Sequence, residues 1–146
     1  MSSDSSFLTL GIAGFGTVGS GLVRILTENR EEILSRTGRD IRIKSILVRD
    51  ATRQRACPLP DGARLTTRMD DLIEDADIDV VVELMGGVDV PANLVERALN
   101  AGKHVVTANK ALLAETGNRL FALAAEKNLH LAYEASVCGG IPIIQT

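Results

Sequence analysis

Tryptophan is absent from this 146-residue chain, cysteine occurs only twice, and aromatic residues make up 3% of it. Cys57 and Cys138 are far apart in the sequence, which argues against a disulfide framework or a thiolate metal site. No apolar run approaches the roughly 18 residues that a membrane-spanning helix needs, so no membrane partner is expected. The start lacks the basic flank and apolar stretch of a signal peptide. A reducing cytoplasm is therefore the predicted location.

An excess of positive charge is also lacking, because the formal net charge is −3. This balance argues against nucleic acid as a partner. With 45% hydrophobic and 24% charged residues, the composition is that of one soluble globular domain. The sequence stops at residues 143–146, directly after a glycine pair and an apolar turn. We therefore expect the chain to be a fragment of a longer protein.

Short apolar runs alternate with longer amphipathic stretches, which is typical of βαβ units around a parallel sheet. The predicted fold class is α/β, with a doubly wound parallel sheet. Residues 1–7 are expected to form a disordered tail and residues 50–66 a loop. One predicted helix has Pro91 in its first turn and Gly102 at its end. The predicted strands are residues 8–13, 41–48, 78–84, 103–107 and 129–133, and the other predicted helices are residues 17–35, 69–76 and 109–128.

Two of the predicted helices have apolar residues at helical spacing. In residues 17–35, they are Val18, Leu22, Ile25 and Leu26, with Ile33 and Leu34 continuing the pattern. In residues 109–128, the inner side is predicted to carry Leu112, Leu113, Leu120, Leu123 and Ala124. His104 and His130 border apolar strands and are interpreted as structural.

A glycine motif of the form G-x-G-x-x-G follows the first predicted strand and opens the first predicted helix, the context that gives it meaning. In a dinucleotide-binding fold of Rossmann type, the first glycine permits a tight turn and the second lets the backbone approach a pyrophosphate. The third permits close packing, and the N–H groups at the helix start face the diphosphate. The alternative is a glycine-rich turn without a ligand. The predicted cofactor-binding residues here are Gly14, Phe15, Gly16, Thr17, Val18 and Gly19.

The end of the second predicted strand bears on the choice of cofactor. The usual fingerprint places an acid about 20 residues after the motif, for the adenine ribose. Asp50 lies well beyond that spacing and is preceded by Arg49. An arginine suits the 2′-phosphate of NADP, so Arg49 is predicted to bind the cofactor and NADP is favoured, with NAD left open. Arg53 and Arg55 either add charge there or belong to the solvated surface.

Two further segments fall where ligands of open α/β sheets bind, at the carboxyl ends of strands. The run Glu83-Leu-Met-Gly-Gly87 ends a strand that is apolar enough to be buried on both faces. Gly86 is predicted to lie against the nicotinamide or its ribose, the alternative being a plain turn. Lys110 begins a predicted helix, where a positive charge opposes the helix dipole. This unfavourable position indicates that Lys110 has a functional role and is not merely a solvated surface residue.

Together these segments resemble homoserine dehydrogenase in order and spacing, from Leu8 onward. The resemblance rests on residues 14–19, 83–87, 102–114 and 133–144; Thr-Ala-Asn-Lys at 107–110 and Glu-Ala-Ser-Val-Cys-Gly-Gly-Ile-Pro at 134–142 are its most specific parts. It implies an oxidoreductase that interconverts L-homoserine and L-aspartate 4-semialdehyde with NAD or NADP, in threonine, methionine and isoleucine biosynthesis. It also implies that residues 8–146 are the NAD(P)-binding domain of a homodimeric enzyme whose dimerisation and substrate regions lie outside this chain.

The resemblance also implies roles for individual residues. Lys110 resembles the lysine that lies between nicotinamide and substrate hydroxyl, as a catalytic and cofactor-binding residue, because alcohol oxidation requires removal of the hydroxyl proton. A sodium site is implied as well, in keeping with the oxygen ligands that hard cations prefer. Its ligands are Glu134 and the carbonyls of Val137, Gly139 and Ile141. We expect the chain alone to bind cofactor and to turn over little or no homoserine. The alternatives are a stand-alone NAD(P) sensor and the cofactor domain of another amino-acid-pathway dehydrogenase.

Overall fold

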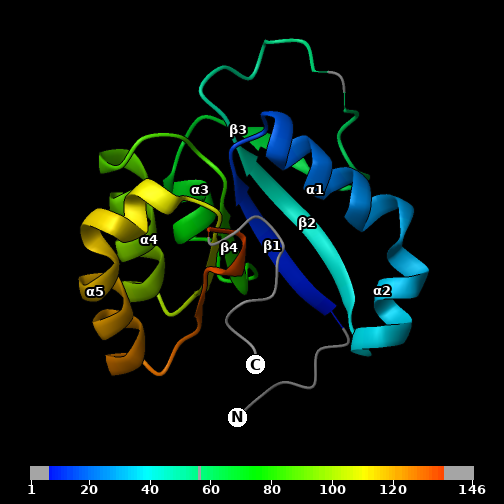
Figure 1. Cartoon of the computed structure of the whole chain (residues 1–146). Helices are drawn as coiled ribbons and strands as arrows, with labels where there is room; N and C mark the ends of the chain where they lie inside the picture. Colours follow the sequence, from blue (N-terminus) through cyan, green and yellow to red (C-terminus); the bar gives the residue numbers. More distant parts are fainter. Residues whose placement is uncertain (1–6, 56, 137–146) are drawn as a thin grey trace.

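A computed structural model of the protein describes residues 7–55 and 57–136. Over these ranges the chain forms a six-stranded sheet of order β3-β2-β1-β4-β5-β6, in which every neighbouring pair is parallel (Figure 1). The strand order reverses between β1 and β4, as in a doubly wound fold, so the predicted fold class is confirmed. The strands are β1 (Phe7–Ala13), β2 (Asp40–Leu47), β3 (Arg64–Thr66), β4 (Val80–Glu83), β5 (His104–Thr107) and β6 (Leu131–Ala132).

Helices cover both faces of the sheet (Figure 1). One face carries α1 (Thr17–Glu28) and α2 (Arg30–Thr37). The other carries α3 (Asp70–Ile73), α4 (Asp89–Asn100) and α5 (Lys110–Glu126), and a 3₁₀ helix, η1 (Glu134–Ser136), follows β6. None of the helices in the described part of the chain has both the length and the hydrophobicity needed to cross a membrane.

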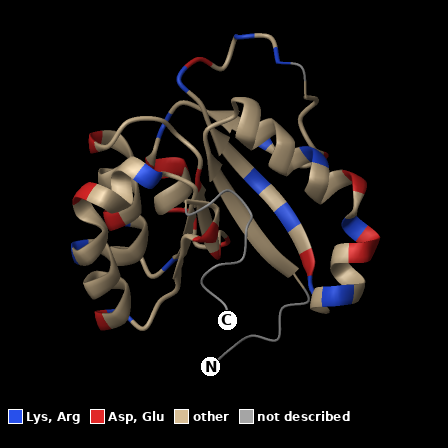
Figure 2. Cartoon of the chain, viewed as in Figure 1, with Lys and Arg blue, Asp and Glu red and all other residues tan. Residues whose placement is uncertain are grey.

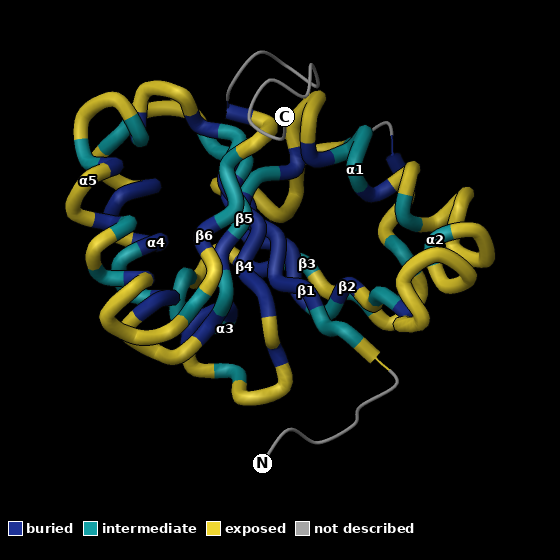
Figure 3. Tube along the Cα trace, turned by 60° about the horizontal axis from the view of Figure 1, so that its bottom comes forward, coloured by how far each residue is buried: buried dark blue, intermediate teal, exposed yellow. Residues whose placement is uncertain are grey.

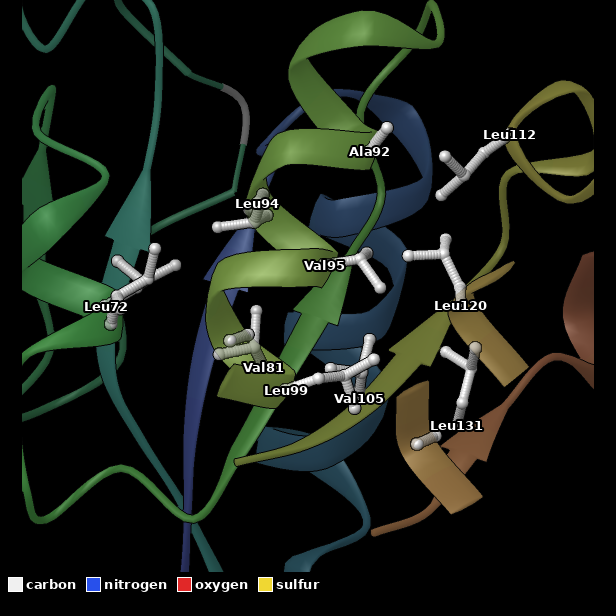
Figure 4. Close-up of a cluster of buried hydrophobic side chains, with 14 of the residues drawn as sticks. Leu72, Val81, Ala92, Leu94, Val95, Leu99, Val105, Leu112, Leu120 and Leu131 are labelled. Carbon is white, nitrogen blue, oxygen red and sulfur yellow. The ribbon is translucent and has the colours of Figure 1, made fainter. Parts of the chain in front are cut away.

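The larger apolar core lies between the sheet and helices α3, α4 and α5. Figure 4 shows side chains of this cluster converging from α4, α5 and the strands beneath them. All four residues of β4 are buried, as their composition predicts, and Figure 3 shows the buried strands at the centre of the molecule. The predicted inner side of α5 is confirmed for Leu112, Leu120 and Ala124, which are buried, and for Leu123, which packs against the same core; Leu113 is half-buried and lies outside this cluster.

The first predicted helix differs from the observed one in extent and orientation. It divides at Asn29 into α1 and α2. Leu22 and Leu26 pack against the core as predicted, whereas Val18 and Ile25 are 61% and 56% exposed. The buried residues of α1 are Gly19 and Val23, one helical turn apart. A side chain on Gly19 would collide with the preceding turn, so its absence allows this side of α1 to pack closely there. The face that bears Val18 and Ile25 is consequently turned outward.

The loop predicted at residues 50–66 contains β3, which the sequence analysis missed. This strand pairs with the end of β2, and the Val48 N–H donates to the Thr66 carbonyl at 2.8 Å. It is short, and Arg64 and Thr66 leave it without the apolar run by which a strand is recognised. In the middle of the sheet, β1 begins at Phe7, one residue earlier than predicted and within the range predicted as a disordered tail.

Candidate functional site: a cleft at the carboxyl ends of the strands

An open cleft of about 1210 Å³ lies at the carboxyl ends of the strands. Its walls come from the glycine turn after β1, the loop between β2 and β3, and the turn between β4 and α4. This is the point where the strand order reverses, at which α/β sheets of this kind bind ligands. The predicted cofactor residues that line it are Gly14, Phe15, Gly16, Thr17, Arg49 and Gly86, whereas Val18, Gly19 and Lys110 are not among its lining residues.

The three glycines of the motif have different surroundings. Gly14 has a φ of +108°, and a Cβ added to it would lie 2.6 Å from the Leu84 carbonyl oxygen. A Cβ on Gly19 would lie 2.1 Å from the Gly14 carbonyl oxygen. A Cβ on Gly16 would meet no atom within 4 Å. Two glycines thus allow the turn to pack against β4 and α1, while the third leaves open space beside the backbone.

The amino terminus of α1 faces this space. Its N-cap is Gly16, which has no side chain to accept a bond from the first turn, and that turn contains no acidic residue. The Ser20 N–H donates to the Gly16 carbonyl at 2.9 Å, so the N–H groups of residues 17–19 precede the hydrogen-bond ladder of the helix. These N–H groups and the helix dipole favour an anion. A dinucleotide pyrophosphate therefore fits the turn, in the space that a Cβ on Gly16 would fill.

The loop after β2 is held by its own hydrogen bonds. The Arg55 guanidinium donates to the carbonyls of Asp50 and Arg53, both at 2.7 Å. The Asp50 carboxylate accepts from the Thr52 hydroxyl at 2.6 Å and from the Thr52 N–H at 2.8 Å. These bonds, the hydroxyl first, hold the pKa of Asp50 below its ordinary value. Asp50 and Arg55 are thus engaged within the loop.

Two other arginines of this region, Arg49 and Arg53, are exposed and line the cleft. Figure 2 shows basic residues along this loop, above the carboxyl ends of the strands. Phe15, by contrast, is a buried member of the core beneath α1, with the Arg55 guanidinium 5.7 Å from its ring centroid. The positive charge that the sequence predicts at this end of the cleft is therefore carried at its surface by Arg49 and Arg53.

At the other end of the cleft, a buried carboxyl joins the ends of β4 and β5. Glu83 is fully buried; it accepts from the Thr107 hydroxyl at 2.5 Å and from the Met85 N–H at 2.7 Å. The Thr107 hydroxyl oxygen in turn accepts from the Asn109 N–H at 3.0 Å. Burial raises the pKa of Glu83, against the opposing effect of these bonds.

Asn109 extends this network to the start of α5. Its side-chain oxygen accepts from the Leu112 N–H at 3.0 Å, as an N-cap does, and its amide nitrogen donates to the Gly87 carbonyl at 2.8 Å. The amide thereby ties the turn after β4 to the start of α5, where the exposed Lys110 follows. Glu83, Thr107 and Asn109 are not among the predicted site residues. The sequence signal for them is an acid at the end of a strand as apolar as β4.

The residues predicted to bind sodium fall largely outside the described ranges. Val137, Gly139 and Ile141 lie there, as does Cys138. Glu134 is exposed in η1, and its carboxylate accepts from the Tyr133 N–H at 3.1 Å. Residues 7–55 and 57–136 contain no group of three or more His, Cys, Asp or Glu side chains arranged to hold a metal ion.

Comparison with known proteins identifies relatives over nearly the whole chain. The family model of the homoserine dehydrogenase NAD binding domain matches residues 14–134. The homoserine dehydrogenase of Bacillus subtilis is 43% identical over 95% of this chain and 32% of that protein, and that of Pseudomonas aeruginosa is 48% identical over 93% and 31%. The crystal structure of a homoserine dehydrogenase from Thiobacillus denitrificans matches with a TM-score of 0.86 and 46% identity over 93% of this chain and 31% of that one. The chain thus spans about a third of the length of these relatives.

Proposed function

This chain belongs to the family of homoserine dehydrogenase NAD-binding domains, and from that premise we propose that it binds NADP(H) in the cleft described above. In a longer protein it would place the nicotinamide for interconversion of L-homoserine and L-aspartate 4-semialdehyde. The observation that carries the proposal is the glycine turn. There the α1 amino terminus and the open side of Gly16 form an anion site that leads directly into the cleft.

The preference for NADP over NAD rests on the loop after β2. NAD selectivity commonly uses a carboxylate at this position to bind the adenine ribose hydroxyls. Here the Asp50 carboxylate is already bound by Thr52. Arg49 and Arg53 line the cleft, and an arginine fork matches a 2′-phosphate.

Lys110 is the residue of this chain that we assign to proton transfer. It is exposed as the first residue of α5, next to Asn109, whose amide contacts the Gly87 carbonyl at the nicotinamide end. The bound nicotinamide supplies hydride transfer, and the Lys110 amine takes the substrate hydroxyl proton during oxidation and returns it during reduction. We further propose sodium at Glu134, Val137, Gly139 and Ile141, a homodimeric complete enzyme in the cytoplasm, and little or no turnover by this chain alone.

Titration with NADPH and NADH, followed by nicotinamide fluorescence, tests the proposal. NADPH should bind more tightly than NADH. Arg49→Ala should weaken NADPH by about tenfold or more, because it removes a charged hydrogen bond, and leave NADH nearly unchanged. Arg39→Ala is the matched control, since Arg39 is exposed and absent from the residues that line the cleft.

The possible results separate the parts of the proposal. Equal or tighter NADH binding contradicts the NADP preference and leaves the cofactor site in place. A folded chain that binds neither dinucleotide contradicts the proposed function itself.

A further inference from the structure

The proton transfer assigned to Lys110 makes no use of the best-buried carboxyl of the site, that of Glu83. This residue pairs with Ala13 of β1 on one side and with Thr107 of β5 on the other. It therefore occupies the carboxyl end of the sheet beside the reversal of strand order. Its exposed fraction is 0%, and its described hydrogen-bond partners are neutral: the Thr107 hydroxyl and the Met85 N–H. A buried carboxyl that lacks a cationic partner is costly, and such groups are commonly found at functional sites.

The carboxyl lies behind the cleft wall formed by the turn between β4 and α4, the end at which the nicotinamide is proposed to bind. One of its oxygens binds the N–H of Met85, the residue before Gly86 in the cleft wall. The other binds Thr107, which holds the N–H of Asn109 just before Lys110. Both segments that border the nicotinamide end are thus fixed by one carboxyl group. Glu83 is thus joined by one hydrogen bond to the segment Met85–Gly87, on which a ligand in this part of the cleft would rest.

The nicotinamide ring has a different charge in the two redox forms of the cofactor. The oxidised nicotinamide ring is cationic and the reduced ring is neutral. Both oxygens of Glu83 accept hydrogen bonds, which favours the ionised form against the opposing effect of burial on the pKa. The buried charge of a carboxylate is poorly screened, whereas the exposed charges of Asp89 and Lys110 are screened by solvent. A charged Glu83 would therefore discriminate between the two forms in a way that these surface groups do not.

We propose that Glu83 is a positioning residue with an electrostatic role: its buried carboxylate favours the oxidised, cationic nicotinamide over the reduced ring, while its hydrogen bonds fix both walls of the nicotinamide end. This inference rests on the proposed function, since it needs the cofactor in this cleft. The property it affects is the ratio of the affinities for oxidised and reduced cofactor, which a purely structural role would leave unchanged.

The first test measures the dissociation constants of NADP⁺ and NADPH for the native chain and for Glu83→Gln, which removes the charge and keeps the shape. The ratio of the NADP⁺ constant to the NADPH constant should rise by about tenfold in the variant, the size expected for one poorly screened charge. Asp89→Asn is the matched control, because Asp89 lines the same cleft and is exposed. It should change the ratio by less than about twofold.

A second measurement needs no variant and so remains decisive if Glu83→Gln does not fold. It compares NADP⁺ with the dinucleotide in which benzamide replaces nicotinamide, an isostere whose ring is neutral. The native chain should bind the nicotinamide form about tenfold more tightly.

Equal affinity for the two rings, or a ratio unchanged in a folded Glu83→Gln, overturns the electrostatic role while the cofactor site stands. If the native chain binds none of these dinucleotides, the proposed function fails, and this inference fails with it.

Discussion

Alanine in place of Gly16 is expected to lower the affinity for NADPH by at least about 100-fold, because the new methyl group displaces the pyrophosphate from two or more charged hydrogen bonds. The fold should be unaffected. Gly16 has φ −85° and ψ −153°, an extended conformation open to any residue, and its Cβ would meet no protein atom within 4 Å. Alanine also reduces the entropy of the unfolded chain, so the melting temperature should stay the same or rise slightly.

Two other glycines make this experiment specific. Gly19→Ala should damage both binding and stability, because its Cβ would lie 2.1 Å from the Gly14 carbonyl oxygen and the turn must move. Gly117→Ala is the control, since its Cβ would make ordinary contacts from 3.6 Å in the interior of α5. Full NADPH affinity in a folded Gly16→Ala chain would show that the diphosphate does not lie at this turn.

The largest loss of stability is expected from Lys103→Met. Lys103 is 5% exposed, and its ammonium group donates to the carbonyls of Asp75 and Ile78 at 2.7 and 2.8 Å. Methionine has similar length and no donor, so the Ile78 carbonyl loses the bond from Lys103, while the Asp75 carbonyl keeps only its bond from the Ile78 N–H at 3.2 Å. The cost should be about 1–3 kcal/mol in the free energy of unfolding, the range for a buried group that loses its partner. The bonds tie the segment before β4 to the start of β5, so unfolding is expected to remain cooperative.

Urea unfolding followed by far-UV circular dichroism measures this loss. Lys127→Met provides the control, because Lys127 is exposed just after α5 and should cost less than about 0.5 kcal/mol. If the two variants unfold at the same urea concentration, the bonds from Lys103 contribute nothing net to stability. Cofactor binding by a folded Lys103→Met chain should be unchanged, since Lys103 precedes β5 and the cleft lies at the opposite ends of the strands.

The positions of the elements were predictable because they depend on local patterns. Alternating apolar runs and amphipathic stretches gave the βαβ order, and Gly102 and Asn109 were correctly placed at helix ends. The glycine motif likewise predicted a turn from β1 into α1, since a backbone with positive φ at Gly14 is a local demand on residue type.

The orientation of α1 was not predictable in the same way. Val18 and Ile25 fit a helical apolar stripe, yet both are exposed. The close approach of Gly19 to the turn decides which side of α1 meets the sheet. Because this contact is made by backbone atoms, the spacing of hydrophobic side chains does not predict it. β3 was missed for a related reason, since its pairing with β2 supplies the stabilisation that its own residues lack.

The sequence by itself determined the family, the fold class and most of the predicted residues that line the cleft, because each depends on residue types at fixed spacing along one segment. Tertiary structure alone decided that Glu83, Thr107 and Asn109 form one network. The physical reason is that hydrogen bonds between strands depend on register, which pairs Glu83 with Thr107 across the sheet. A network of this kind, joining residues from separate segments, comes into being only when the strands align.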